Sequence, residues 1–400
     1  GAPTVQINGA SQSDLETVFA SVGPNPATGV VSGTLANNGG PAETIALADS
    51  AINPAIDAGD DLLAGVPSTD ARGFARSDFP GVANNGASIS DLGAFEVSNQ
   101  IVVTTLDDTV DPNDGQTSLR EALALANSSA GNVTITFDPS LSGGTLTLDP
   151  GLGLLKITAN DITIDGDTNG DGTPDITISG GNNTAVLFTA TNGNIHTTLD
   201  GLVIENGYAS PTTGFGGGIF VGDHDSLTLT NSIIADNSAA DGGGIFVSNQ
   251  ASLAMADSTV SDNAAVKAGG GIVGYSGATL ALTNVPISGN SAAKGGGIIG
   301  TANDQITLAD STITGNKTTV AGGGGLYSSG ASAVTTVTNS IVAGNSSASA
   351  GDDLDGDSGA KLVLTGGNIL GSNPANFSST DTTNGSYTAI DGTSQSDLRS

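Results

Sequence analysis

The second half of the chain repeats itself about every 27 residues, and this period limits the fold more than any other feature. Each copy holds an alternating apolar run, a polar break, a short apolar run, an Asn, a Gly triplet and a further apolar run. Three strands this short cannot bury a core alone, so neighbouring copies must stack. The repeat predicts an all-β chain folded as a right-handed parallel β-helix, with three strands per coil. The copies begin near Leu199, Leu227, Leu253, Leu280, Ile306, Val334 and Leu362.

Side-chain alternation favours strands over helices in these copies. Residues 227–230 read Leu-Thr-Leu-Thr and residues 280–283 read Leu-Ala-Leu-Thr, the period of a half-buried strand. Within the repeats, apolar residues do not recur at helical spacing.

One Asn recurs in register in successive copies, and a Gly triplet follows it. An Asn at each coil corner can stack into a ladder of amide hydrogen bonds and tolerates a left-handed backbone. The glycines supply positive φ angles where the chain turns. We interpret both series as structural rather than ligand-binding, because stacking demands one placement in every coil. The predicted ladder consists of Asn237, Asn263, Asn290, Asn316 and Asn345.

Composition narrows the possible partners. Nine Lys and Arg stand against forty Asp and Glu, a net charge of −31 in 400 residues. Such a surface repels nucleic acid and anionic membranes and favours divalent cations. No apolar run is long enough for a membrane span. The chain has no Cys, which is compatible with an extracellular bacterial fibre. We therefore expect an extracellular or cell-surface location.

The two ends of the chain share a motif. Residues 11–15 read Ser-Gln-Ser-Asp-Leu, and residues 394–398 repeat it. A chance match in a Ser-rich chain is one explanation. The other is that the chain is one period of a longer tandem array, in which the next unit continues each β-helix.

Three segments resemble families of bacterial surface proteins. Residues 117–127 read TSLREALALAN and resemble the CSLREA domain, with Thr117 in place of its Cys. Residues 35–96 include AINPAIDAGDD and ISDLGAFE and resemble the choice-of-anchor Q domain. The repeats from 198 onward are similar to polymorphic outer-membrane-protein repeats. These resemblances imply a surface or adhesin-like protein.

In those families the anchor-like module closes the β-helix, whereas here it comes first. The resemblance therefore implies three parts: residues 1–100 complete a preceding β-helix, residues 101–135 are a CSLREA-like start with a capping helix, and residues 136–400 form the coils. Copies of the chain would then join head to tail through a heterologous contact.

The CSLREA-like segment predicts a short helix near residues 118–127. Ser118 and Glu121 have the spacing of a capping box. Leu119, Ala122 and Ala126 fall on one helical face. Such a helix would cover strand edges of the first coil. Capping explains Glu121 without assigning it a catalytic role.

One acidic loop has the pattern of a metal site. Oxygen ligands at alternate positions, with Gly between them, suit Ca²⁺ and resemble the start of an EF-hand loop, although position 12 is Ile176. The alternative is a solvated turn between two strands. We predict structural calcium; the candidate ligands are Asp165, Asp167, Asn169, Asp171 and Asp175.

Two further acidic groups are expected to be solvated turns rather than calcium sites, and two arginines are expected to be structural. The first group follows a strand-like run, the second lies in the last coil, and the arginines belong to the anchor-like module. These residues are Asp57, Asp60 and Asp61; Asp352, Asp353, Asp355 and Asp357; and Arg72 and Arg76.

A polysaccharide lyase or hydrolase is the principal rival, because β-helices include such enzymes. That chemistry needs a base or a carboxylate set, and cations for an anionic sugar chain. Lys267 and Lys294 are expected at exposed turns, while His196 and His224 lie apart from any evident nucleophile. An adhesin would need exposed aromatic residues; the candidates for a sparse stripe are Tyr208, Tyr275 and Tyr327.

The sequence thus favours a noncatalytic structural protein, a β-helical unit of a bacterial surface or matrix filament whose partners are copies of itself. An adhesin stalk that binds a cell surface or a polysaccharide is the alternative, and an enzyme is third.

Overall fold

The computed structural model divides the chain into two compact units, residues 1–105 with 109–138, and residues 106–108 with 139–400. The structure describes residues 15–24, 31–36, 44–48, 53–56, 58–59, 71, 90–94, 100–111, 114–128, 133–189, 193–348, 352–372, 374–382 and 385–389.

The first unit begins with two small antiparallel pairs. β1 (Val22–Pro24) pairs with β2 (Val31–Gly33), and β3 (Leu35–Ala36) pairs with β4 (Thr44–Ile45). A small apolar cluster accompanies them, formed by Val18, Leu47, Ala55 and Ile56.

A helix connects two parallel strands later in this unit. β5 (Gln100–Val103) pairs in parallel with β6 (Val133–Phe137), and α2 (Leu119–Ser128) contacts both. Parallel neighbours need a crossover, and the helix provides it. The face that α2 buries holds Leu119, Ala122, Leu123 and Ala126.

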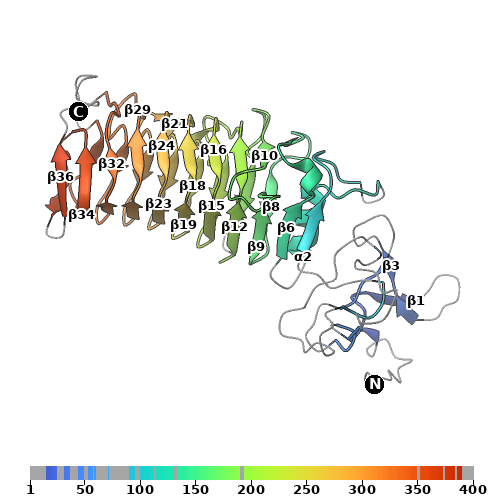
Figure 1. The fold of residues 1–400 in the computed structure, drawn as a ribbon. Helices are drawn as coiled ribbons and strands as arrows, with labels where there is room; N and C mark the ends of the chain where they lie inside the picture. The colour runs from blue at the N-terminus through green and yellow to red at the C-terminus, as the bar shows by residue number, and fades with distance from the viewer. Residues whose placement is uncertain are drawn as a thin grey trace. The chain divides into compact units, whose positions relative to one another are not determined.

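The second unit is a stack of coils in which strands pair in parallel with their counterparts in the neighbouring coils (Figure 1). A 3₁₀ turn at Pro139–Leu141 precedes the first coil. Four sheets run along the stack. The first sheet contains β9 (Ile162–Asp165), β12 (His196–Asp200), β15 (Ser226–Thr230), β19 (Ser252–Ala256), β23 (Thr279–Thr283), β27 (Gln305–Ala309), β31 (Val334–Thr338), the start of β34 (Lys361–Leu370), and β35 (Ser379–Asp381).

The second sheet follows after one corner. It contains β7 (Thr145–Thr147), β10 (Ile176–Ser179), β13 (Leu202–Glu205), β16 (Ile233–Ala235), β20 (Thr259–Ser261), β24 (Pro286–Ser288), β28 (Thr312–Thr314), β32 (Ile341–Val342), the end of β34, and β36 (Gly385–Ala389).

The third sheet completes the coils, and a fourth sheet is present in four of them. The fourth, short sheet lies between the second and the third in chain order and was not expected from the sequence. The third contains β8 (Leu155–Ile157), β11 (Leu187–Thr189), β14 (Ile219–Val221), β18 (Ile245–Val247), β22 (Ile272–Gly274), β26 (Ile298–Gly300), β30 (Leu326–Ser328) and β33 (Leu354–Gly356), and the fourth β17 (Ser238–Asp241), β21 (Ala264–Ala268), β25 (Ser291–Ala292) and β29 (Lys317–Thr318).

The core is a column of aliphatic side chains inside the coils. Leu227 pairs with Leu253, and Leu253 with Leu280, so like residues stack at each interior position. All three are buried. Stacking identical side chains at the strand spacing of ~4.8 Å fills a narrow interior without large rings.

The pairing register corrects two of the predicted copy starts. Thr197, not Leu199, pairs with Leu227, and Thr335, not Val334, pairs with Ile306. Both threonines occupy interior positions that other coils fill with Leu or Ile. Because Thr is polar, the apolar–polar alternation indicated a different residue as the first interior position of each of these two copies.

The corners place positive φ angles differently from the expectation. The ladder asparagines do not adopt left-handed backbone; the residue before each one does, such as Asp262 with φ 56° and Gly289 with φ 70°. In a Gly triplet the first member has positive φ, as Gly242 does at 65°. At Gly243 a Cβ would lie 2.5 Å from Gly270 O of the next coil, so close packing excludes a side chain there.

None of the helices among the described residues is long and apolar enough to cross a membrane.

Candidate functional site

The five predicted ladder asparagines form one continuous stack. The side-chain amide of each donates to Oδ1 of the next, from Asn237 to Asn263 at 3.0 Å and so on to Asn345 at 2.9 Å. Each amide also donates to a main-chain carbonyl, as Asn290 does to Val260 O at 3.0 Å. All five residues are buried. The stack satisfies main-chain groups that the corner would otherwise leave unpaired.

The stack ends on a carboxylate that sequence reasoning missed. Asn345 donates both its main-chain N–H and its side-chain amide to Asp353 Oδ1, each at 2.9 Å. An ionised carboxylate only accepts, so it terminates a one-way chain of donors. The expectation that Asp353 and Asp355 lie in a solvated turn is wrong, because both are buried and Asp355 belongs to β33. Burial raises the pKa of Asp353, and its hydrogen bonds from Asn345 oppose the shift.

The helix cap has the geometry of a capping box. The Ser118 main-chain N–H donates to Glu121 Oε2 at 2.9 Å, and the Glu121 N–H donates to Ser118 Oγ at 3.1 Å. Glu121 also accepts the N–H of Asp111 at 2.8 Å. Its carboxylate therefore holds the segment that leads into α2.

In the predicted metal loop, side-chain oxygens accept the loop's own N–H groups. Asp167 accepts from Gly170 at 2.7 Å and from Gly172 at 2.8 Å. These hydrogen bonds lower the pKa of Asp167. Asn169 and Asp171 make similar local turns.

The remaining two candidates fix the ends of this loop. Asp165 accepts from the Asp167 N–H at 3.0 Å, and Asp175 binds the hydroxyl of Thr168 at 2.6 Å and that of Ser142 at 2.9 Å. Burial raises the pKa of Asp165, and hydrogen bonding to Thr168 lowers that of Asp175. In the part of the chain that the structure describes, no three carboxylates or imidazoles converge as a metal site. The carboxylate oxygens of the loop suit a hard cation, but in this arrangement of the loop the carboxylates do not converge on one point.

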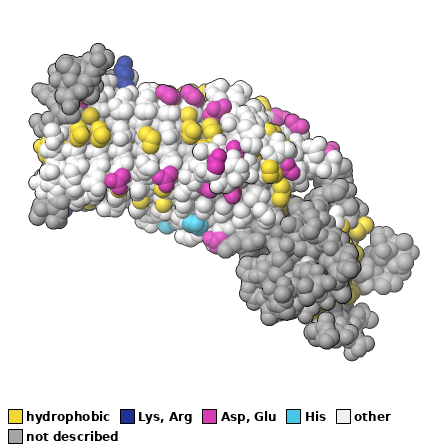
Figure 2. Space-filling view, viewed as in Figure 1, with side chains coloured by type: hydrophobic (Ala, Val, Ile, Leu, Met, Phe, Trp, Pro, Cys, Tyr) yellow, Lys and Arg dark blue, Asp and Glu magenta, His cyan; other side chains and the backbone are white. Residues whose placement is uncertain are grey.

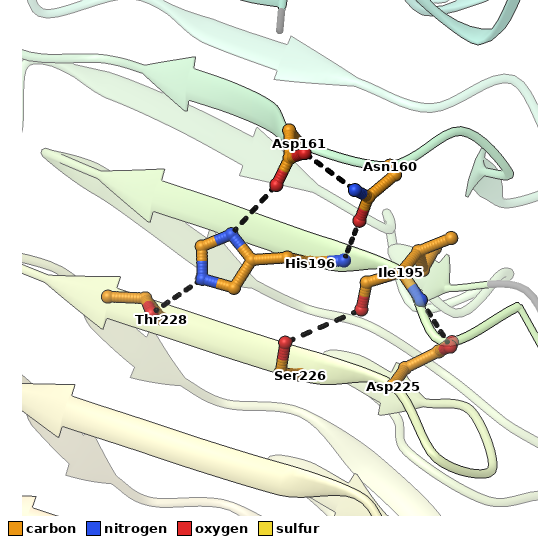
Figure 3. Close-up of polar contacts among 7 residues, drawn as sticks. All are labelled: Asn160, Asp161, Ile195, His196, Asp225, Ser226 and Thr228. Carbon is orange, nitrogen blue, oxygen red and sulfur yellow. Dashed lines mark hydrogen bonds and ion pairs between the residues drawn. The ribbon is translucent and has the colours of Figure 1, made fainter.

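His196 lies between two side chains of neighbouring coils (Figure 3). Its Nδ1 is 3.7 Å from Asp161 Oδ1, and its Nε2 is 3.4 Å from Thr228 Oγ1. Its main-chain N–H donates to Asn160 at 2.7 Å. The order Asp, His, Thr resembles a catalytic relay.

Two features argue against a relay there. Nucleophile and base need hydrogen-bond contact near 3 Å, and neither side-chain contact of His196 is that short. His196 and Asp161 are also half exposed, at 46% and 43%, so water competes for both. The group is a surface network on the first sheet.

The three candidate tyrosines do not form one stripe. Tyr208 is bridged to Ser238 beside the fourth sheet, whereas Tyr327 belongs to the third. Tyr327 is buried and donates to Asp357 at 2.6 Å; burial raises its pKa to about 12. Tyr275 is half exposed after β22.

Sequence reasoning missed the outward face of the third sheet. The middle residues of β14, β18, β22 and β26 point away from the core yet are apolar: Phe220, Phe246, Val273 and Ile299. The signal was present, because strands such as Ile-Phe-Val have an apolar residue where alternation requires a polar one.

Some predictions lie outside the described residues. These are the acidic group at Asp57, Asp60 and Asp61, the structural arginines Arg72 and Arg76, and most of the repeated terminal motif.

Comparison with known proteins identifies the coils. The family model described as a right-handed β-helix region matches residues 184–374, from just before β11 to the end of β34 and beyond. No curated protein and no solved structure matches the chain. The predicted right-handed parallel β-helix is confirmed. This fold is consistent with structural, adhesive and polysaccharide-active proteins.

Proposed function

We propose that the chain is a noncatalytic structural protein, a β-helical unit of a bacterial surface or matrix filament whose copies join head to tail. One observation carries the proposal, namely that each coil repeats the same parallel pairing with the next, as β31 does with β34 and β34 does with β36. Stacking of like units in this way is head to tail, and a head-to-tail contact between copies generates a filament unless it closes into a ring.

The use of polar side chains supports a structural role. The ladder asparagines, Asp353 and Glu121 are engaged in main-chain hydrogen bonds. On the face drawn in Figure 2, acidic side chains are spread over the coils and basic ones are scarce. An anionic polymer would be repelled by this charge.

Location and cofactor belong to the same proposal. The resemblance to CSLREA and choice-of-anchor Q proteins supports an extracellular or cell-surface site. Structural calcium at the Asp165–Asp175 loop is supported by its oxygen donors, because carboxylates that accept N–H groups keep further lone pairs for a cation.

Electron microscopy of the full chain tests the proposal. Long filaments of stacked units are expected, and removal of residues 1–98, which precede β5, should prevent their formation. Single rods at all concentrations would contradict the head-to-tail joint, and so would filaments that persist without residues 1–98. Release of reducing ends from neutral or acidic polysaccharides would contradict a noncatalytic role.

A further inference from the structure

The third sheet carries a groove along its outer face. Its floor has one side chain per coil, in pairing register: Phe220 with Phe246, Phe246 with Val273, and Val273 with Ile299. The last three are buried although they point away from the core. Walls must therefore stand on both sides of them.

One wall comes from the chain segments next to the fourth sheet. Phe215 bridges to Asp241, and Asp241 pairs with Ala268 one coil on. Lys267 Nζ is 3.9 Å from Asp241 Oδ2 and donates to Thr212 O at 2.7 Å. These two contacts connect the segments that form this wall. Burial raises the pKa of Asp241, and Lys267 opposes the shift.

The other wall consists of Ser248, Tyr275 and Thr301, which follow β18, β22 and β26. The Ser248 hydroxyl donates to Asp223, and Thr301 Oγ1 accepts the Ser276 N–H at 2.8 Å. Each hydroxyl oxygen keeps a lone pair for a donor from outside.

Floor and walls border an open pocket of about 400 Å³. Two aromatic rings stand at its sides, Phe215 at 47% exposure and Tyr275 at 50%. Both contact the same floor ring, since the centroid of Phe246 is 4.8 Å from that of Phe215 and 5.9 Å from that of Tyr275. Aromatic rings are normally buried away from water. Two exposed rings on either side of a buried third ring therefore form an apolar surface that suits a flat ligand.

The polar groups of the pocket specify the ligand further. The lining offers oxygen acceptors, from Asp241, Ser248 and Thr301, beside apolar rings. A matching ligand has an apolar face and many hydroxyl donors. The net charge of −31 disfavours an anionic one.

We propose that this groove binds a neutral oligosaccharide chain, whose C–H faces lie on Phe215, Phe246 and Tyr275 and whose hydroxyls donate to Asp241, Ser248 and Thr301. The oligosaccharide lies parallel to the axis of the coil stack, so that successive sugars contact successive coils. This binding is independent of head-to-tail assembly.

Calorimetry on the full chain tests the proposal. The probes are neutral hexasaccharides of β-1,4-linked glucose, mannose and xylose, with polygalacturonate as the anionic comparison. We expect at least one neutral probe to bind, and Tyr275→Ala to weaken that binding about fivefold, since an aromatic contact contributes roughly 1 kcal/mol. Phe215→Ala should have a similar effect.

Tyr208→Ala is the matched control, because this Tyr is also exposed but lies outside the pocket. It should bind as the unaltered chain does, and circular dichroism should show all three variants folded. The proposal is overturned if no neutral probe binds, if polygalacturonate binds more tightly, or if Tyr275→Ala and Phe215→Ala leave the affinity unchanged.

Discussion

Asn263 donates both its main-chain N–H and its side-chain amide to Oδ1 of Asn290 in the next coil, each at 3.0 Å. One side-chain oxygen thus satisfies two donors of the neighbouring coil. The same arrangement recurs at Asn290 and Asn316. Adjacent coils are therefore coupled at this corner through buried side chains as well as through their sheets.

Removing one member of the ladder should destabilise the coils. Asn290→Ala leaves the two donors of Asn263 and the carbonyl of Val260 unpaired in a buried corner. Each unpaired group costs about 1–3 kcal/mol, so we expect a loss of roughly 3–5 kcal/mol in unfolding free energy. Urea unfolding followed by circular dichroism measures it. Asn183→Ala, which removes an exposed amide, should change stability by less than about 0.5 kcal/mol.

Thr335→Val should stabilise the protein. The Thr335 hydroxyl is buried and has no hydrogen-bond partner, while its neighbours in register are Ile306 and Leu362. Valine has nearly the same shape and no polar group to bury, so we expect a gain of about 1 kcal/mol. Thermal unfolding measures the gain, and the outward-facing Thr336→Val is the control. A less stable Thr335→Val variant would show that the hydroxyl has a partner.

Stability should depend on pH through Asp304. Burial raises the pKa of Asp304 to about 6 from 3.8, although N–H groups of Thr301, Ala278 and Gly277 oppose the shift. The folded state holds this proton more tightly than the unfolded state does. The resulting contribution is fully present below about pH 4 and is lost as the pH rises through about 6.

The variant Asp304→Asn, which cannot titrate, isolates this contribution. Two pKa units correspond to about 3 kcal/mol, so the wild type should lose about that much stability relative to the variant between about pH 4 and pH 7. Urea unfolding at several pH values provides the comparison. A constant difference between the two proteins would contradict the assignment.

Calcium binding to the loop from Asp165 to Asp175 is testable by titration calorimetry. We expect weak binding, with a dissociation constant on the order of 10⁻⁴–10⁻³ M. The double variant Asp167→Asn with Asp171→Asn should lose the heat of binding. Asp262→Asn changes an exposed corner residue with a positive φ, which Asn tolerates. This variant should retain the heat of binding. Equal heat in all three proteins would place the ion elsewhere, and no heat would remove calcium from the proposed function.

The repeat predicted the coil architecture because stacking requires like residues at like positions. Leu227 and Leu253 show this directly, since they pair in register. The predicted start of a copy was wrong where a polar side chain occupies an interior position, as at Thr335.

The missed features depend on contacts between residues far apart in the chain. Asp353 terminates the ladder although it does not occupy the repeat position of an Asn. The groove could not be predicted from the sequence, because its walls around Phe246 are formed by Phe215 and Tyr275, which belong to different coils. Alternation alone shows that Phe246 points outward, but not that other residues cover it.

The ladder also determines how the length of such a protein can change. An additional coil placed after Asn263 would bring an Asn of its own. The Oδ1 of that residue would accept from Asn263 and its side-chain N–H would donate to Oδ1 of Asn290, so both contacts would form as they do between the present coils. Duplication of whole coils thus preserves the ladder. The coils themselves differ in length, since successive ladder residues are 26, 27, 26 and 29 positions apart, so a new coil has to keep the Asn at this corner rather than a fixed number of residues. Related chains should therefore differ by whole coils, each with an Asn at this corner.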